Sequence, residues 1–107
     1  MLAKRAADVK VVAFACEAGM GSSLIGANQL KKRIKDLGRE VRVIHSPVNE
    51  IPADTDVVIA HEALAERARR VAPGAVVLTF RNFMNNTASD RLVQSLKTGE
   101  DLVAEQS

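Results

Sequence analysis

The feature that most constrains the fold of this chain is a regular alternation of short apolar, β-branched runs with amphipathic stretches of helical periodicity. The pattern predicts the order β-α-β-β-α-β-α, with short connections between the elements. Strands that alternate with helices in this way are typical of a parallel sheet with helices on both faces. We therefore predict an α/β fold, a three-layer sandwich of one four-stranded parallel sheet and three helices.

The four predicted strands differ in their expected burial. Residues 9–15 are apolar with one charge, as in a strand that is covered on both faces. Residues 41–45 alternate enough to favour an edge or half-exposed strand, and the remaining strands are expected at 56–60 and 75–79. Residues 46–54 show no clear helix, although this connection must cross over the sheet if the strands beside it are parallel.

Three helices are predicted from apolar side chains that recur at spacings of three and four. The first carries Leu24, Ala27, Leu30, Ile34 and Leu37. Gly38 is well placed to end it. The other two are expected at about residues 62–71 and 89–97. The first eight and about the last nine residues are predicted to be flexible ends, which leaves a core of about residues 9–97.

Composition limits the class of protein. The 107 residues are enough for a single domain, and 47% hydrophobic with 26% charged residues is typical of a folded globular chain. A net charge of +2 and an aromatic content of 3%, all of it Phe, speak against a nucleic-acid partner. No apolar run approaches the roughly 18 to 20 residues of a membrane span, and the first residues lack a signal peptide.

The single cysteine excludes an internal disulfide and every multi-cysteine metal site, so we expect a reducing cytoplasm and no metal. Cys16 ends the first predicted strand and opens the segment CEAGMGSS, which leads into the first helix. Two glycines let the backbone turn tightly, and the helix start supplies unpaired amides and a positive dipole end. Such a loop cradles anions and favours the thiolate over the thiol. A thiolate there is suited to attacking phosphorus and holding a phosphoryl group.

The plainer alternative is that Cys16 is buried filler and that the glycines only make a turn; on the residues alone the two interpretations are about even. Other phosphate loops do not fit. Gly26 is not followed by the Lys of a Walker motif, and Leu24 stands where the dinucleotide fingerprint needs a third small residue. A Cys-x5-Arg phosphatase loop requires Arg at the position of Ser22. Its absence favours a thiol that passes the phosphoryl group on over one that releases it to water.

The segments ACEAGMGSSLIGANQLKKRI, DVVIAHEALAERA and LTFRNFM carry a resemblance. Together they are similar to the IIB domain of the bacterial phosphoenolpyruvate-dependent sugar phosphotransferase system, most closely the mannitol-specific type, over about residues 9–97. The resemblance implies a phosphatase-like active loop after the first strand of a parallel sheet. It maps the phosphorylated cysteine onto Cys16 and the phosphate loop onto Glu17, Ala18, Gly19, Met20, Gly21, Ser22 and Ser23. Glu17 replaces the usual Asp and keeps the acid.

The resemblance also implies partners. A phosphohistidine on a IIA domain would donate to Cys16, and the phosphocysteine would donate to a sugar, mannitol by resemblance, held by a membrane IIC domain. No cofactor or metal is implied. We expect a single domain over residues 1–107, a monomer when isolated, working in the cytoplasm at the inner face of the membrane.

Further side chains are expected on the same rim, because the carboxyl ends of parallel strands meet at one edge of a sheet. His61 is a possible accessory residue, either as a donor to the phosphoryl oxygens or as the cap of the following helix. His45 is predicted to be an edge residue without a role, and Arg81 and Asn82 are placed near the same rim. Two other functions stay open: a thiol enzyme like the low-molecular-weight phosphatases, and a regulatory docking module of the same fold.

Overall fold

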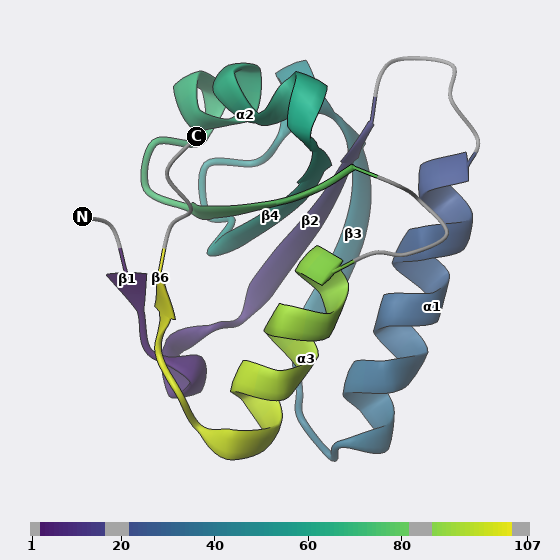
Figure 1. Ribbon diagram of the computed structural model, residues 1–107, viewed down its shortest axis with the longest axis vertical. Coiled ribbons are helices and arrows are strands. Elements are labelled where there is room, and N and C mark those ends of the chain that lie inside the picture. Colours follow the sequence, from purple (N-terminus) through teal and green to yellow (C-terminus); the bar gives the residue numbers. More distant parts are fainter. Residues whose placement is uncertain (1–2, 17–21, 82–86, 104–107) are drawn as a thin grey trace.

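One parallel sheet of four strands organises the molecule, and the computed structural model places them in the order β3-β2-β4-β5 (Figure 1). The structure describes residues 3–16, 22–81 and 87–103. The four strands are β2 (Val11–Cys16), β3 (Arg42–Pro47), β4 (Val57–His61) and β5 (Val76–Phe80). All three pairings between them are parallel, which confirms the predicted sheet.

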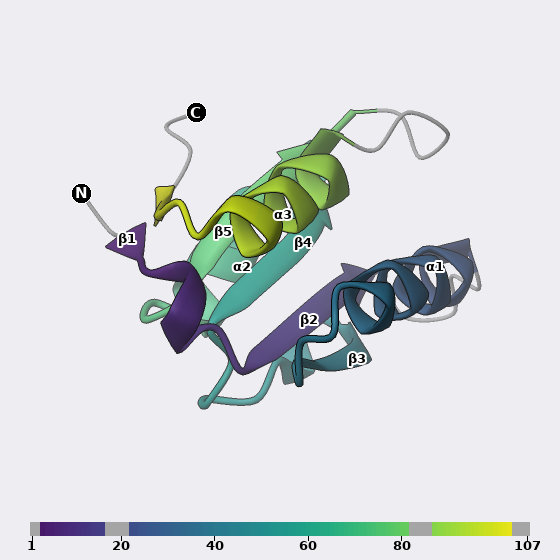
Figure 2. The same ribbon diagram turned by 90° about the horizontal axis from the view of Figure 1, so that it is seen from below.

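Helices cover both faces of this sheet, in the three layers that the sequence predicts (Figures 1 and 2). Helices α1 (Ser22–Asp36) and α3 (Thr87–Thr98) share one hydrophobic cluster with the sheet, and α2 (Ala65–Val71) belongs to a second cluster on the opposite face. The predicted helix at 62–71 is wrong in its first turn, because Glu62–Leu64 forms a 3-10 turn, η3, ahead of α2.

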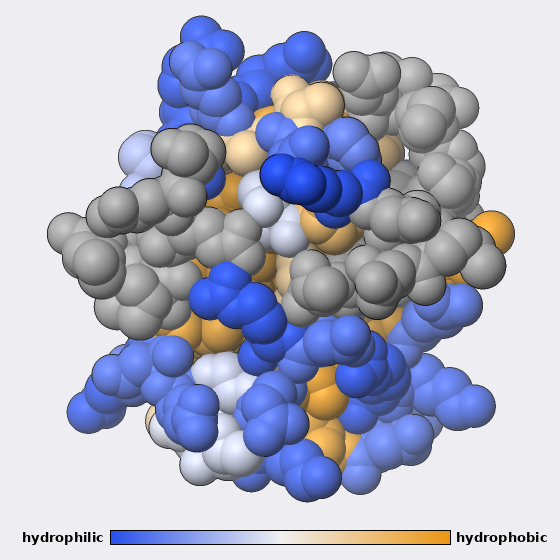
Figure 3. All heavy atoms as spheres, in the orientation of Figure 1, coloured by the Kyte–Doolittle hydropathy of each residue, from blue (hydrophilic) through white to orange (hydrophobic). Residues whose placement is uncertain are grey.

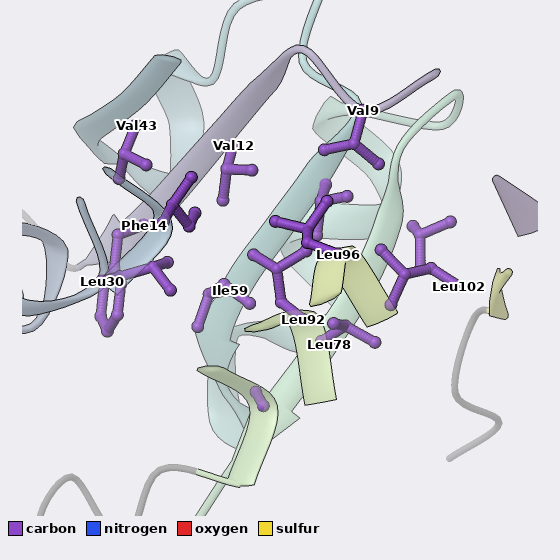
Figure 4. Packing of buried hydrophobic residues seen from close by; sticks show 14 of the residues in the cluster. Val9, Val12, Phe14, Leu30, Val43, Ile59, Leu78, Leu92, Leu96 and Leu102 are labelled. Atoms are coloured by element: carbon purple, nitrogen blue, oxygen red, sulfur yellow. The ribbon is translucent and has the colours of Figure 1, made fainter. Parts of the chain in front are cut away.

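The two clusters arise from the alternation of side chains along each strand. The face under α1 and α3 holds the bulky residues, many of which are labelled in Figure 4, among them Phe14, Leu30, Ile59, Leu78 and Leu92. The face under α2 holds smaller residues, among them Ala13, Val58, Ala60, Ala68 and Val77. The short α2 therefore packs closely on small side chains.

The connection from β3 to β4 crosses over β2 without a full helix. It contains a 3-10 turn, η2 (Val48–Glu50), and buries Val48 and Ile51 in the cluster under α2. These two side chains cover the sheet where a longer crossover would place a helix. β3 is one of the two edge strands of this sheet, in agreement with its alternating pattern, and Arg42 and His45 are exposed.

The chain ends correct one prediction. Residues 3–4 form β1, which pairs in antiparallel fashion with β6 at residues 102–103 (Figure 1). A 3-10 turn, η1 (Ala6–Asp8), follows β1, and both Ala6 and Leu102 are buried in the main cluster. The expectation of flexible ends is wrong for these segments, and the core extends beyond residues 9–97. Apolar residues near both chain ends thus pack into the main cluster beneath α3.

The outward sides of α1 and α3 are charged, as the periodicity predicts. Figure 3 shows hydrophilic residues over most of this face, with apolar residues recessed between them. Among the large apolar side chains that the structure describes, Ile25 in the first turns of α1 is exposed, at 57%.

Candidate functional site

The chemistry-bearing residues meet at the carboxyl ends of the strands, as predicted. Cys16 ends β2, His45 lies two residues before the end of β3, and His61 ends β4. Alternation puts Cys16 on the same face as Phe14, His45 on that of Val43, and His61 on that of Ile59. Phe14, Val43 and Ile59 all belong to the cluster under α1 and α3. The three side chains therefore share one end and one face of the sheet.

Cys16 is nearly buried, with 6% of the residue exposed. Its Sγ lies 3.3 Å from Nε2 of His45 and 3.6 Å from the backbone carbonyl oxygen of Ser46. The Sγ–H group is only a weak donor to that carbonyl, and the donor in the contact with Nε2 depends on the tautomer of His45. Cys16 thus has two polar neighbours, which a purely apolar packing residue does not need.

His45, predicted to be an edge residue without a role, is in contact with the sulfur of Cys16. β2 and β3 pair with Phe14 opposite His45 and Cys16 opposite Pro47. His45 consequently stands diagonally across from Cys16 on the same face, a spacing that a long or aromatic side chain can bridge. A single strand pattern cannot reveal this contact, because it depends on the register between two strands 29 residues apart.

The segment after Cys16 joins β2 to the N-terminus of α1 (Figure 1). The predicted phosphate-loop residues Glu17 to Gly21 lie outside the described residues, as do the side chains of Ser22 and Ser23. The backbone of those serines begins α1, whose first turn carries no acidic residue. The first amides of a helix lack partners within it and attract negative charge. Five residues therefore separate Cys16 from the N-terminus of α1, whose own first turn carries no acidic side chain.

His61 shows the capping alternative. Its Nδ1 accepts a hydrogen bond from the backbone N–H of Ala63 at 3.1 Å, and its Nε2 lies 3.0 Å from the carbonyl oxygen of Arg81. Because Nδ1 accepts, the ring proton is on Nε2 and is donated to Arg81. Both nitrogens are engaged with backbone, and the ring packs edge-on against Phe80. His61 thus joins the start of η3 to the end of β5.

The remaining rim residues are less closely placed. The Arg81 guanidinium pairs with the Glu62 carboxylate at 3.0 Å, and both side chains are at least half exposed. Asn82 and Met20 lie outside the described residues. Within the described part of the chain, no three His, Cys, Asp or Glu side chains gather as metal ligands. No helix in that part is long and apolar enough to cross a membrane.

Comparison with known proteins decides the family. Residues 11–95 match the family model "PTS system, Lactose/Cellobiose specific IIB subunit", in which PTS denotes the phosphotransferase system. The chain belongs to the PTS IIB family. The resemblance drawn from the CEAGMGSS segment and its two companions is confirmed.

Several relatives of this IIB domain that match over most of the chain are mannitol-specific. The chain is 40% identical to the mannitol-specific EIICB component of Geobacillus stearothermophilus over 85% of its length and 19% of the relative's. It is 39% identical to the mannitol-specific EIICBA component of Vibrio cholerae over 94% of its length and 16% of the relative's. The chain therefore spans about a fifth or less of these proteins.

Among solved structures, the chain is similar to the lactose-specific IIB component domain from Streptococcus pneumoniae. The likeness covers 86% of this chain and 90% of that one, with 23% identity and a TM-score of 0.47. The parallel sheet of this chain is established by its own strand pairings.

Proposed function

We propose that this IIB domain is a phosphocarrier whose Cys16 accepts a phosphoryl group from a phosphohistidine on a IIA domain. The phosphocysteine then donates it to mannitol held by a membrane IIC domain. The observation that carries the proposal is the position of Cys16, at the carboxyl end of a central parallel strand and immediately before the loop that enters α1. The mannitol-specific relatives support the sugar.

Each transfer exchanges one bond to phosphorus for another. In the first, the sulfur of Cys16 forms the P–S bond while the bond from phosphorus to the donor imidazole nitrogen breaks, and its electron pair returns to that nitrogen. In the second, a sugar hydroxyl oxygen forms the O–P bond, the P–S bond breaks and the electron pair returns to sulfur. The hydroxyl proton passes to a base on the IIC partner. Positioning and charge neutralisation provide most of the catalysis in such steps.

The residues around Cys16 have corresponding roles in this proposal. Backbone amides of residues 18–23 and the N-terminus of α1 hold the phosphoryl oxygens. Glu17 follows the phosphorylated residue, Cys16, directly in the sequence. His61 holds Arg81, the residue that follows β5, through the backbone carbonyl of Arg81. The names of the relatives join C, B and A components in one protein, which supports IIA and IIC domains as donor and acceptor partners at the inner membrane face.

The test is a phosphorylation assay read by intact mass. The domain is incubated with phosphoenolpyruvate, the general phosphotransferase proteins and a mannitol-type IIA domain. We expect a gain of one phosphoryl group in the wild type and none in Cys16→Ser. No gain with any IIA domain tried would favour a docking module, and a gain that survives Cys16→Ser would refute the assignment of the site. Rapid turnover of an aryl phosphate would instead favour a phosphatase.

A further inference from the structure

The ring of His45 is the described titratable group in contact with the sulfur of Cys16. Nε2 of the ring lies 3.3 Å from Sγ, and the ring reaches it from an exposed position on the edge strand β3. The donor and acceptor in this contact depend on the tautomer of the ring. Where a single proton lies between the two atoms, either the thiol donates it to Nε2 or a protonated Nε2 donates it to the thiolate.

We propose that His45 is a catalytic residue of the phosphotransfer, which holds the Cys16 proton while the sulfur carries the phosphoryl group. The proposal rests on the proposed function and adds a residue that the family motif around Cys16 does not contain. It assigns His45 a proton-transfer role, since imidazole is the side chain that most readily gains and loses a proton near neutral pH.

The proton balance closes over one cycle. When sulfur attacks phosphorus, the Sγ proton moves to Nε2 and leaves an imidazolium beside the newly bound, negatively charged phosphoryl group. When the sugar hydroxyl later attacks, sulfur leaves as a thiolate and recovers the proton from Nε2. The donor takes no proton from this chain, because a phosphohistidine that is protonated on its second ring nitrogen leaves as a neutral imidazole. His45 therefore ends the cycle in the state in which it began it.

The surroundings of His45 favour this role. β3 packs against β2, which contributes Cys16, and against α1, which carries no charged residue from Ser22 to Leu30. The first charge of α1 is Lys31, about 13 Å along the axis from the helix start at 1.5 Å per residue. On β3 the charged neighbour is Arg42, three residues away, and Glu50 follows in η2. An imidazolium is thus placed opposite the sulfur and its phosphoryl group.

The other histidine of the site cannot serve in the arrangement described. Both ring nitrogens of His61 are engaged with backbone groups, one accepting from Ala63 and the other donating to Arg81. Protonation of Nδ1 would break its hydrogen bond with Ala63. His61 therefore has a positioning role, and the proton-transfer role falls to His45.

The first experiment measures the His45–Cys16 pair without any partner protein. The chain is alkylated with iodoacetamide over a range of pH, and the rate is compared for wild type, His45→Ala and His45→Gln. The thiolate is the reactive form. We expect about a three- to tenfold slower reaction at pH 7 in His45→Ala, with half-maximal rate reached at higher pH. Arg42→Ala, an exposed change on the same strand, should match the wild type. Rates that are equal in all four proteins would overturn the pairing.

The second experiment measures phosphotransfer from the IIA domain to the same variants. We expect His45→Ala to be slower by about tenfold or more, as is common when a proton-transfer group is lost. His45→Gln keeps a hydrogen-bonding side chain that does not titrate, so it should also be slow and should lose the pH dependence near neutrality. Wild-type rates in His45→Gln would overturn proton transfer by His45.

The two experiments separate this proposal from the proposed function. If wild type and both variants are phosphorylated on Cys16 at equal rates, the carrier function stands and the role of His45 is refuted. If alkylation depends on His45 but Cys16 is never phosphorylated, the pair exists and the carrier function is refuted, and with it the catalytic role of His45. Circular dichroism of each variant establishes that the fold is retained.

Discussion

At the scale of single residues, the site is built from side chains whose neighbours decide their roles. Cys16 and His61 end adjacent parallel strands, yet one faces a titratable ring and the other is engaged with backbone on both nitrogens. Asp56 shows the same principle at the opposite end of the sheet. Its carboxylate accepts hydrogen bonds from Lys4 Nζ at 2.8 Å and from the backbone N–H groups of Lys10 and Val11 at 2.8 and 3.0 Å.

These contacts change the acidity of Asp56. Burial alone would raise the pKa of the carboxyl, but the hydrogen bonds from Lys4, Lys10 and Val11 outweigh it, and the pKa of Asp56 lies below its usual 3.8. A lowered pKa in the folded state means that the native protein binds fewer protons than the unfolded chain. The contribution of Asp56 to stability is therefore complete above about pH 4, and it is lost as the pH falls through the lowered value.

Asp56→Asn tests this contribution. The amide cannot carry the charge that the three donors face, so we expect the free energy of unfolding at pH 7 to fall by about 1–3 kcal/mol. The difference from wild type should shrink as the pH falls below about 4. Urea unfolding at pH 7 and pH 3 measures both effects, with exposed Asp54→Asn as the control. A difference that is equal at both pH values would contradict the linkage.

At the scale of elements, α1 is the helix that positions the site, and its two ends are stabilised differently. Its N-terminus receives the chain from Cys16, and its C-terminus ends at Asp36 before Gly38. Gly38 has a φ of 75°, in the left-handed region that favours glycine, and its N–H donates to the carbonyl of Lys35. The exposed Arg33–Asp90 pair between α1 and α3 adds little, as is usual for surface ion pairs.

Gly38→Ala measures this helix end. A Cβ at position 38 meets no atom within 4 Å, so the cost is conformational, and we expect about 1 kcal/mol of destabilisation. Gly74→Ala is the matched control, because that glycine has equally open space and no positive φ. Thermal or urea unfolding of both variants gives the comparison. Equal effects in the two would show that the left-handed conformation of Gly38 contributes nothing.

At the scale of the whole molecule, the two chain ends are part of the fold. β1 and β6 form a small second sheet beside the main one. Arg39, which follows α1, donates to the carbonyl oxygen of Ala6 in η1 at 2.7 Å. The Lys4–Asp56 ion pair adds a contact to the start of β4. The segments near the two chain ends are thereby held together at the end of the sheet away from Cys16.

Leu102→Ala tests whether this closure contributes to stability. Leu102 is 3% exposed within the main cluster. Truncation of a buried leucine to alanine typically lowers the free energy of unfolding by about 2–5 kcal/mol, and we expect a loss of about 2–4 kcal/mol here. Its neighbour Asp101 is exposed, and Asp101→Ala should change the free energy of unfolding by less than about 0.5 kcal/mol. Urea unfolding distinguishes the two. A negligible loss of unfolding free energy in Leu102→Ala would support the original prediction of a flexible C-terminal end.

The sequence by itself determined the order of the four main strands and three helices, the parallel sheet, the edge position of β3 and the location of Cys16 before a helix. Those properties follow from local periodicity and composition, which short segments carry on their own. The family also follows from the sequence, through the CEAGMGSS segment and its matches. Helix ends such as Gly38 were predictable because their backbone requirement is local.

Only the tertiary structure decided which side chains meet. The contact of His45 with Cys16 depends on the register of β2 and β3. The contact of His61 with the carbonyl oxygen of Arg81 depends on the pairing of β4 with β5. The pairing of residues 3–4 with 102–103 likewise joins segments from opposite ends of the chain. Such contacts leave no periodic signal within either segment. The pattern of each segment reflects its own secondary structure, and the partner is set only when the segments pack together.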